Sequence, residues 1–214
     1  LVLGEGDQEE SRDHVVIKTV HTSDESVLLA IMELYGVRRW HVDVTFSKGG
    51  FYKPKTSIQV PLLALDIDPC KKKEFINIEK ADVRDLPLYD NSIFSIVCDL
   101  PFIHAPGKKS IIGNRFGGFP SQKALRECYH AALKEFARVL APGGIVAWKM
   151  QDCVESGKQN WTHVYPFLWC DDIPELEVVD LFIRTNEGQS RGHNHGRQVH
   201  ARRSHCYWLV IRKT

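Results

Sequence analysis

The residues of this chain best suited to do chemistry are Asp99-Leu100-Pro101-Phe102, which follow the apolar run Ile93-Phe94-Ser95-Ile96-Val97-Cys98. The run predicts a buried strand, so the carboxylate, the proline and the ring should lie just past its carboxyl end. In an open α/β sheet, ligands bind at that edge. A carboxylate that accepts a hydrogen bond, beside a ring that stacks, suits the exocyclic amino group of a nucleobase. The alternatives are a turn cap for Asp99 and core packing for Phe102.

Acidic residues also recur where three other predicted strands finish, at Asp43, Asp66 and Asp82. A strand-end acid about 20 residues after a glycine turn can bind both hydroxyls of a ribose, and Asp66 follows Gly49-Gly50 at about that distance. Asp82 could accept a hydrogen bond from an adenine amine. A single aspartate often only caps a turn, but several in register favour a ligand site.

The sequence has neither GxGxxG after the first strand nor GxxxxGK[ST], which disfavours a dinucleotide-binding protein and an NTPase. A nucleoside-type cofactor without a pyrophosphate fits better.

Strand-like segments alternate with helical or loop connections, which predicts a parallel, doubly wound sheet. Seven strands are expected, near 40–46, 62–67, 75–78, 93–98, 145–150, 176–183 and 206–211. Helices are expected from an N-cap at 22–24 to about residue 36, and over 124–140 before Pro142-Gly143-Gly144. The last two strands could form an antiparallel hairpin at the edge of the sheet.

The chain has 214 residues, 43% of them hydrophobic, which suits one domain with a sizeable core. Residues 1–14 are polar and are expected to be flexible, and 15–214 to form the domain. The six cysteines include no CxxC pair, which favours reduced thiols in an intracellular protein of the cytoplasm or nucleus. No apolar stretch approaches the roughly 20 residues that cross a bilayer, so no membrane contact is expected.

The order of these motifs resembles class I S-adenosylmethionine-dependent methyltransferases, specifically the DNA/RNA amino-methyltransferase group that modifies adenine N6 or cytosine N4. The similarity covers about residues 19–213. It is carried by Asp43-Val-Thr-Phe-Ser-Lys-Gly49-Gly50, Leu65-Asp66-Ile67-Asp68, Ala81-Asp82-Val83-Arg84-Asp85-Leu86-Pro87, Asp99-Leu-Pro-Phe102 and Phe136-Ala-Arg-Val-Leu-Ala-Pro-Gly-Gly144. The fourth stretch resembles the catalytic [DNS]PP[YFW] motif. Two residues depart from the pattern, Ser47 at the usual first loop glycine and Leu100 at the usual first proline.

The resemblance implies a Rossmann-like α/β fold, with a seven-stranded, mostly parallel sheet and helices on both faces. It implies S-adenosyl-L-methionine as the cofactor, bound by Asp43, Thr45, Gly49, Asp66, Asp82 and Val83. It also implies a catalytic turn of Asp99, Pro101 and Phe102. There, the Asp99 carboxylate and the Pro101 carbonyl would accept both hydrogens of the target amine, and Phe102 would stack on the base.

Cytosine C5 methylation is disfavoured, because it needs a nucleophilic thiol and the Pro69-Cys70 step lies after the second strand, on the ribose side. Cys98 directly precedes Asp99 but is expected to face the core. Three alternatives remain open: a nucleic-acid methyltransferase, a degenerate partner subunit that binds nucleic acid, and a methyltransferase for a small molecule or protein.

Two basic loops favour nucleic acid as the substrate, although solvated loops are the alternative. One spans 104–120 and contains Lys108, Lys109 and Arg115, and the other spans 187–203 and contains Arg197. The His193-x-His195 spacing could chelate a metal, but no cysteine or acid cluster is near it, so no metal site is expected.

Overall fold

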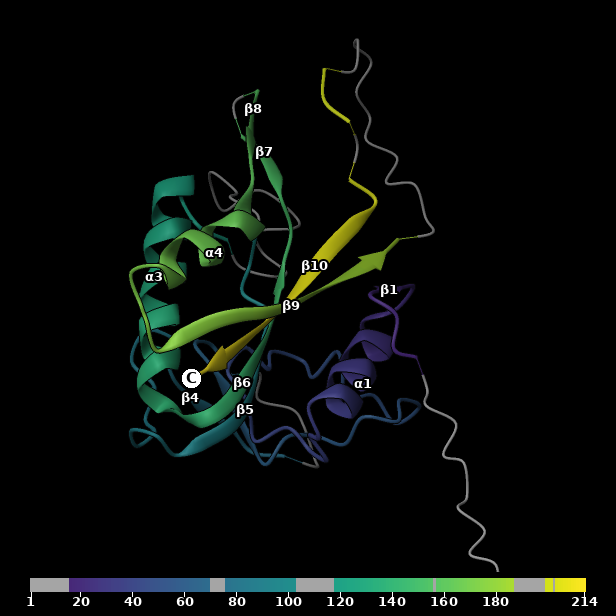
Figure 1. The fold of residues 1–214 in the computed structure, drawn as a ribbon, viewed down its shortest axis with the longest axis vertical. Coiled ribbons are helices and arrows are strands. Elements are labelled where there is room, and N and C mark those ends of the chain that lie inside the picture. Colours follow the sequence, from purple (N-terminus) through teal and green to yellow (C-terminus); the bar gives the residue numbers. More distant parts are fainter. Residues whose placement is uncertain (1–15, 70–75, 103–117, 156, 187–198, 202) are drawn as a thin grey trace, which may run out of the picture.

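The computed structural model describes residues 16–69, 76–102, 118–155, 157–186, 199–201 and 203–214, and shows a sheet with helices on both faces (Figure 1). The segment 1–14 expected to be flexible lies outside these residues. The main-sheet strands are β1 Val20–His21, β2 Val42–Asp43, β3 Leu63–Asp66, β4 Ile78–Lys80, β5 Ile93–Cys98, β6 Leu140–Met150, β9 Leu176–Thr185 and β10 His205–Lys213. A hairpin pairs β7 Cys153–Glu155 with β8 Lys158–Asn160. The helices are α1 Asp24–Leu34, α3 Gln122–Val139 and α4 Tyr165–Cys170, with a 3-10 turn η1 Thr162–Val164.

The strand order is β1-β9-β10-β6-β5-β2-β3-β4. The strands β4, β3, β2, β5 and β6 pair in parallel, and β10 is antiparallel to both β6 and β9. Numbered along the chain, the parallel strands follow the 3-2-1-4-5 order of a doubly wound sheet. The chain reverses its direction across the sheet between β2 and β5, so the switch point lies between these two strands.

The predicted parallel sheet and the antiparallel pairing of the last two strands are confirmed, but the number of strands is not. The main sheet has eight strands rather than seven, because β1 adds to its edge beside β9. With two residues, one of them the exposed Val20, β1 has no apolar pattern that could reveal it.

The strand expected over 40–46 is shorter than predicted, because only Val42–Asp43 keeps regular pairing. Beyond it, the Val44 N–H donates to the Val97 carbonyl of β5 at 3.1 Å, whereas the Phe46 N–H donates to the Leu65 carbonyl of β3 at 3.0 Å. After Asp43, the backbone therefore no longer pairs regularly with β3 and β5, and it turns at the carboxyl edge of the sheet.

Serine caps begin both long helices, and their apolar faces cover opposite sides of the sheet. The Ser23 hydroxyl accepts from the Ser26 N–H at the start of α1, and the Ser121 hydroxyl accepts in the same way from the Ala124 N–H of α3. The helix α3 ends at Val139 and not in the predicted Pro-Gly-Gly turn, because the next residue already pairs with β5.

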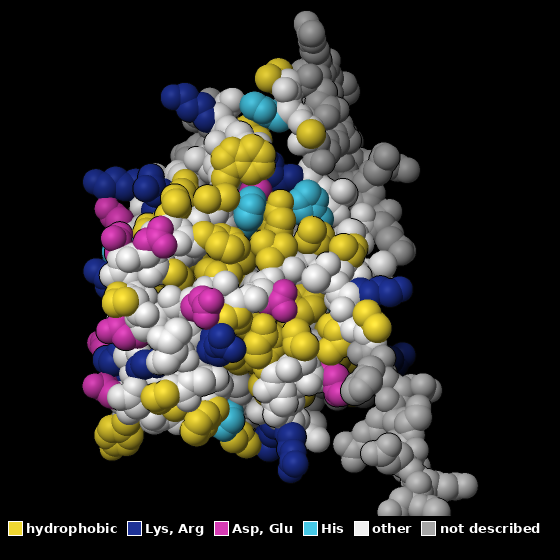
Figure 2. Space-filling model, viewed as in Figure 1, with side chains coloured by type: hydrophobic (Ala, Val, Ile, Leu, Met, Phe, Trp, Pro, Cys, Tyr) yellow, Lys and Arg dark blue, Asp and Glu magenta, His cyan; other side chains and the backbone are white. Residues whose placement is uncertain are grey.

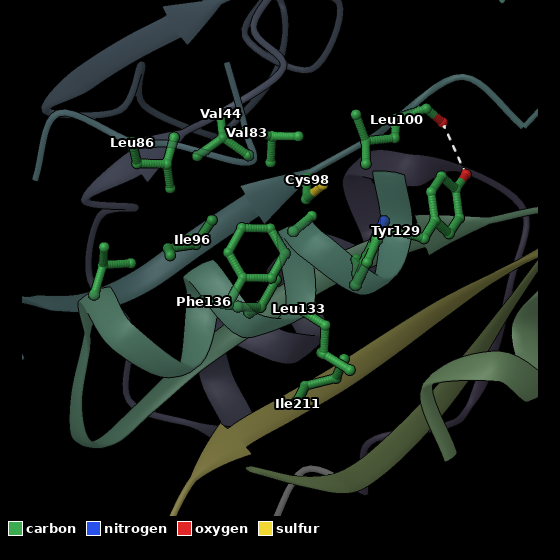
Figure 3. Packing of buried hydrophobic residues seen from close by; sticks show 14 of the residues in the cluster. Val44, Val83, Leu86, Ile96, Cys98, Leu100, Tyr129, Leu133, Phe136 and Ile211 are labelled. Atoms are coloured by element: carbon green, nitrogen blue, oxygen red, sulfur yellow. Dashed lines mark hydrogen bonds between the residues drawn. The ribbon is translucent and has the colours of Figure 1, made fainter. Parts of the chain in front are cut away.

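The helix α3 packs on β5 through Leu133 and Phe136, which contact the cluster containing Ile96 and Cys98 (Figure 3). Cys98 is fully buried, as predicted. On the other face, α1 buries its apolar side chains in a second cluster that includes Trp208. Within the described part of the chain, no helix combines the length and the apolar character needed to span a bilayer.

Candidate active site

The four acids singled out in the sequence lie at the carboxyl edge of the parallel strands. Asp43 and Asp66 end β2 and β3, Asp99 directly follows β5, and Asp82 comes two residues after β4. Because β2 and β5 are neighbours at the switch point, Asp43 and Asp99 lie where doubly wound sheets bind their ligands.

The Asp99 residue is held on one side and open on the other. Its backbone N–H donates to Thr45 Oγ1 at 2.7 Å, which fixes the turn after β5. Its Oδ2 accepts a hydrogen bond from Lys149 Nζ at 3.3 Å, and no described residue donates to Oδ1. The side chain is 26% exposed. Asp99 therefore presents one carboxylate oxygen to a ligand.

Lys149 joins Asp99 to Asp24 at the start of α1, where its Nζ lies 3.2 Å from Oδ2. The rings of Phe51 and Trp208 flank this ammonium group, with centres 5.3 and 5.8 Å from Nζ. Burial lowers the pKa of Lys149, but the two carboxylates outweigh burial and hold the pKa above its usual value. Burial raises the pKa of Asp99, and Lys149 opposes that rise. Lys149 is therefore a cation that fixes the Asp99 carboxylate.

A pocket of about 370 Å³ opens beside Asp99 and Lys149. Its volume falls within the roughly 300–1,000 Å³ of small-molecule sites. Its wall also includes residues of α1 and of the loop after β2: Asp24, Glu25, Thr45, Phe46, Gly50, Phe51, Lys53 and Thr56. Three carboxylates and two ammonium groups thus surround it, which suits a ligand that carries both a positive and a negative group.

Sequence reasoning missed Lys149 and Phe51, and treated Asp24 only as a capping candidate. One signal was available: Lys149 is the only charged residue in the otherwise apolar stretch 145–150. A lysine inside a buried strand needs a partner of opposite charge.

Asp43 is buried and faces the protein interior, with 1% of its surface exposed. Its Oδ1 accepts from the Thr45 N–H at 2.9 Å and from Thr45 Oγ1 at 3.3 Å, and its Oδ2 accepts from the Tyr52 hydroxyl at 2.9 Å. Burial raises the pKa of Asp43 to about 7, although these hydrogen bonds oppose the rise. Asp43 thus holds the loop after β2 and supports the Asp99 turn through Thr45.

Asp66 stabilises the same loop from β3. Its Oδ2 accepts from the Ser47 N–H at 2.7 Å, and its Oδ1 accepts from the Asp68 N–H at 2.9 Å. Ser47 has φ of 48° and Gly49 has φ of 61°, both in the left-handed region. Ser47, at the position of an expected glycine, therefore adopts the conformation that glycine would allow, and the Asp66 carboxylate holds its N–H.

Asp82 is paired with Arg84 at the next strand end. The Arg84 side chain donates to Asp82 Oδ1 at 2.9 Å and to Oδ2 at 2.6 Å, and it lowers the pKa of Asp82 below the usual value. Val83 between them is buried. The carboxylate of Glu135 in α3 accepts the Leu86 N–H at 2.7 Å, which anchors this loop on the helix.

Leu100 stands where the expected motif has its first proline, and other contacts shape the turn there. Leu100 is 7% exposed and packs in the core that contains Tyr129 (Figure 3). The Tyr129 hydroxyl lies 3.4 Å from the Leu100 carbonyl oxygen and 3.3 Å from that of Pro101. Pro101 and Phe102 are half-buried at the start of the turn. Packing and Tyr129 thus hold the turn.

The predicted nucleic-acid contacts Lys108, Lys109, Arg115 and Arg197 lie outside the described residues, as do His193, His195 and Cys70. Among the residues that the structure describes, no group of three potential metal ligands occurs.

Solved structures with a similar arrangement include several methyltransferases. A candidate sarcosine dimethylglycine methyltransferase from Galdieria sulphuraria matches with a TM-score of 0.50 at 18% identity, over 75% of this chain and 62% of its own. A candidate DNA modification methylase, TTHA0409 from Thermus thermophilus, complexed with S-adenosyl-L-methionine, has a TM-score of 0.44 at 17% identity, over 62% of this chain and 53% of its own. The cytosine-N4-specific PvuII DNA methyltransferase has a TM-score of 0.47 at 16% identity, over 64% and 48%.

The chain spans about half the length of TTHA0409 and of the PvuII enzyme. At such low sequence identities, the matches show a shared fold and nothing more. The Galdieria match and the strand order together identify that fold. The fold is the Rossmann-like fold of class I methyltransferases. No protein-family model matches the sequence, and no curated protein does. In this class I fold, Asp99 and the pocket lie at the ligand-binding edge.

Proposed function

We propose that this protein is an S-adenosyl-L-methionine-dependent methyltransferase that acts on an exocyclic amino group of a nucleobase, adenine N6 or cytosine N4, in DNA or RNA. The observation that carries the proposal is Asp99 Oδ1, to which no described residue donates. Asp99 lies at the switch point beside the pocket and is followed by Leu100, Pro101 and Phe102. A fixed carboxylate oxygen next to a ring is suited to an aromatic amine.

The pocket fits the amino-acid end of S-adenosyl-L-methionine in charge. Asp24 and Glu25 would attract its ammonium group, and Lys53 its carboxylate. When bound, the cofactor supplies an electrophilic methyl group.

The remaining cofactor contacts come from the strand ends. Asp66 would bind the ribose hydroxyls, and Asp82 and Val83 the adenine. Thr45 and Gly49 would line the loop after β2, which Asp43 holds in place.

The residues of the Asp99 turn would then act mainly by positioning. Asp99 Oδ1 and the Pro101 carbonyl accept the two amine hydrogens, and the second lone pair of that carbonyl stays available beside Tyr129. Lys149 favours the ionised form of Asp99, which can accept hydrogen bonds with both oxygens. Asp99 takes the proton that the amine loses and passes it to solvent. Phe102 stacks on the base.

The test is transfer of radiolabelled methyl to single-stranded DNA and RNA, to duplexes and to small amines, with Asp99→Ala beside the wild type. The backbone bond of residue 99 to Thr45 survives this substitution, so the turn stays in place. We expect the rate to fall roughly 100- to 1,000-fold, the effect of losing one pre-positioned polar group. Asp171→Ala, at an exposed aspartate after α4, is the matched control. Wild-type transfer that survives Asp99→Ala would refute the role of Asp99.

A second candidate function is a partner subunit of the same fold that binds nucleic acid without catalysis. It is favoured by one observation: both oxygens of Asp66 and both of Asp82 already accept hydrogen bonds from the chain itself. Isothermal titration with S-adenosyl-L-methionine separates the two functions. Binding that weakens in Asp66→Ala supports the enzyme, and an absence of binding supports the partner subunit.

A further inference from the structure

Four ring-bearing side chains cluster around η1 and the start of β10, and the proposed mechanism uses none of them. His163 and Tyr207 stack, with centroids 4.0 Å apart and planes 21° apart. Trp161 meets His163 edge-on at 6.4 Å, and His205 meets Tyr207 edge-on at 5.0 Å. Trp161 is 55% exposed. We call Trp161, His163, His205 and Tyr207 the ring cluster.

Hydrogen bonds fix the rings of His163, His205 and Tyr207 before any partner arrives. Asp152, with 1% of its side chain exposed, lies 2.7 Å from His163 Nδ1 and also accepts the His163 N–H at 3.3 Å. His205 Nε2 lies 2.9 Å from the Tyr207 hydroxyl, and Gln151 Nε2 donates to the His205 carbonyl at 3.0 Å. A surface held in this way loses little conformational entropy when it binds.

The ring cluster lies at the same sheet edge as the Asp99 turn. Tyr207 pairs with Met150 of β6, and the adjacent Lys149 contacts Asp99 beyond β5. Tyr207 is thus two strands from the turn, about 10 Å away at the spacing of strands in a sheet. Figure 2 shows histidine and hydrophobic side chains gathered on this part of the surface, over the hairpin and the start of β10. Tyr207 pairs with Met150 and Trp208 with Lys149, so the ring of Tyr207 lies on the α3 face of the sheet and Lys149 on the α1 face. A nucleic-acid strand that contacts both Asp99 and the ring cluster must therefore pass over this edge of the sheet.

The surroundings of the ring cluster are basic. The segments 157–168, 199–201 and 203–207 contain Lys158, Arg203 and several histidines but no aspartate or glutamate. Arg203 lies close enough to Tyr207 to oppose the rise in the pKa of Tyr207 that burial and Asp152 cause. Asp152 is the carboxylate in direct contact with the cluster, and only 1% of its side chain is exposed. Exposed rings beside Lys158 and Arg203 match a strand that offers base faces and phosphates.

We propose that the ring cluster is a stacking platform for unpaired bases that flank the target base, so that the substrate is a single-stranded segment of DNA or RNA. This inference rests on the proposed function for its target base. Bases in a duplex are already stacked on one another and offer no free face to Trp161, whereas each unpaired base does.

The test is fluorescence anisotropy with short labelled oligonucleotides of mixed sequence, as single-stranded DNA, single-stranded RNA and duplex DNA. Trp161→Ala should weaken binding to the preferred single strand roughly 5- to 150-fold, the range for losing one stacked ring. Trp161→Leu keeps the bulk but not the ring, so it should show a similar loss. The matched control is Phe94→Ala, because Phe94 is 57% exposed and lies at the amino end of β5, away from the platform. Comparing DNA with RNA identifies the natural strand.

Salt dependence separates stacking from charge. Arg203→Gln should reduce the slope of log affinity against log salt by about one, whereas Trp161→Ala should leave the slope unchanged. Affinity that matches the Phe94→Ala control, or an equal loss for duplex DNA, would overturn the platform.

Binding is measured without cofactor, so the two proposals fail separately. Methyl transfer by the wild type with unchanged binding by Trp161→Ala refutes only the platform. Trp161-dependent binding without any methyl transfer refutes only the proposed methylation.

Discussion

Asp43→Asn isolates the titration of the buried carboxyl that supports the loop after β2. The Asp43 oxygens accept hydrogen bonds from Thr45 at 2.9 and 3.3 Å and from Tyr52 at 2.9 Å. An asparagine of the same size keeps a carbonyl oxygen for Thr45 and turns its NH₂ toward the Tyr52 hydroxyl, which can accept as well as donate. The packing and the number of hydrogen bonds are therefore retained, and only the ionisable group is removed.

The sign and the size of the effect follow from the pKa of Asp43. Burial raises that pKa from 3.8 to about 7, so the folded protein keeps the proton over a range in which the unfolded chain has lost it. The free energy of unfolding therefore has its full value below about pH 4 and falls as the pH rises to about 7. A shift of about 3 units amounts to roughly 4 kcal/mol, of which roughly 3 kcal/mol is lost between about pH 5 and pH 8. The asparagine variant lacks this loss.

The assay is urea unfolding of both proteins across that pH range, with the difference in free energy of unfolding as the readout. Titrating groups that do not interact with Asp43 act equally in both proteins and cancel. Between about pH 5 and pH 8, the free energy of unfolding of Asp43→Asn should rise relative to that of the wild type by roughly 3 kcal/mol. Tyr52→Phe removes a hydrogen bond that lowers the pKa of Asp43, so it should extend the window to higher pH. A difference between Asp43→Asn and the wild type that is flat with pH would refute the reasoning.

Three further substitutions test the contacts around the site. Lys149→Met should lower kcat for methyl transfer. It should also move the acidic limb of the pH–rate profile to higher pH, because Lys149 opposes the rise in the pKa of Asp99. Lys149→Arg keeps the positive charge and should leave the acidic limb in place. His163→Ala removes the ring hydrogen bond of the buried Asp152 and leaves it the N–H of residue 163, so it should lower the free energy of unfolding in urea by roughly 1–3 kcal/mol. Arg138→Met removes hydrogen bonds of 2.8 and 3.0 Å to carbonyls of the loop after β4, the loop that contains Asp82 and Val83. Calorimetry should therefore show weaker binding of S-adenosyl-L-methionine. Arg138→Lys should restore part of the affinity.

The parallel part of the sheet was predictable because its longest strands, β5 and β6, are mostly buried. The run 93–98 is almost wholly apolar, and the run 145–150 nearly so, as expected for strands covered by helices on both sides. The buried stripe of α3 recurs at helical spacing and ends where the chain enters β6. Once the strands are parallel, acids that follow them must lie at one edge, so the position of Asp99 beside Asp43 follows from the pattern.

The contacts of those acids were not predictable, because they depend on residues far apart in the chain. Lys149 meets Asp24 across 125 positions, and nothing in the local sequence of either residue specifies the other. Ser47 was noted as a departure from glycine, but its positive φ and the support from Asp66 appear only in three dimensions. Leu100 also departs from the motif, and its packing in the core depends on the approach of α3.

The two acids at the switch point divide their roles because their surroundings differ. The charge of Asp99 contributes to the raised pKa of Asp43, and Asp43 has only neutral donors around its oxygens. Asp99 has the Lys149 ammonium group. Lys149 therefore favours the ionised form of Asp99, whereas burial without a cation favours the protonated form of Asp43. Thr45 connects them, since its hydroxyl accepts the Asp99 N–H at 2.7 Å and donates to Asp43 at 3.3 Å. Asp43 thus fixes the turn, and its protonated form adds no second negative charge near Asp99.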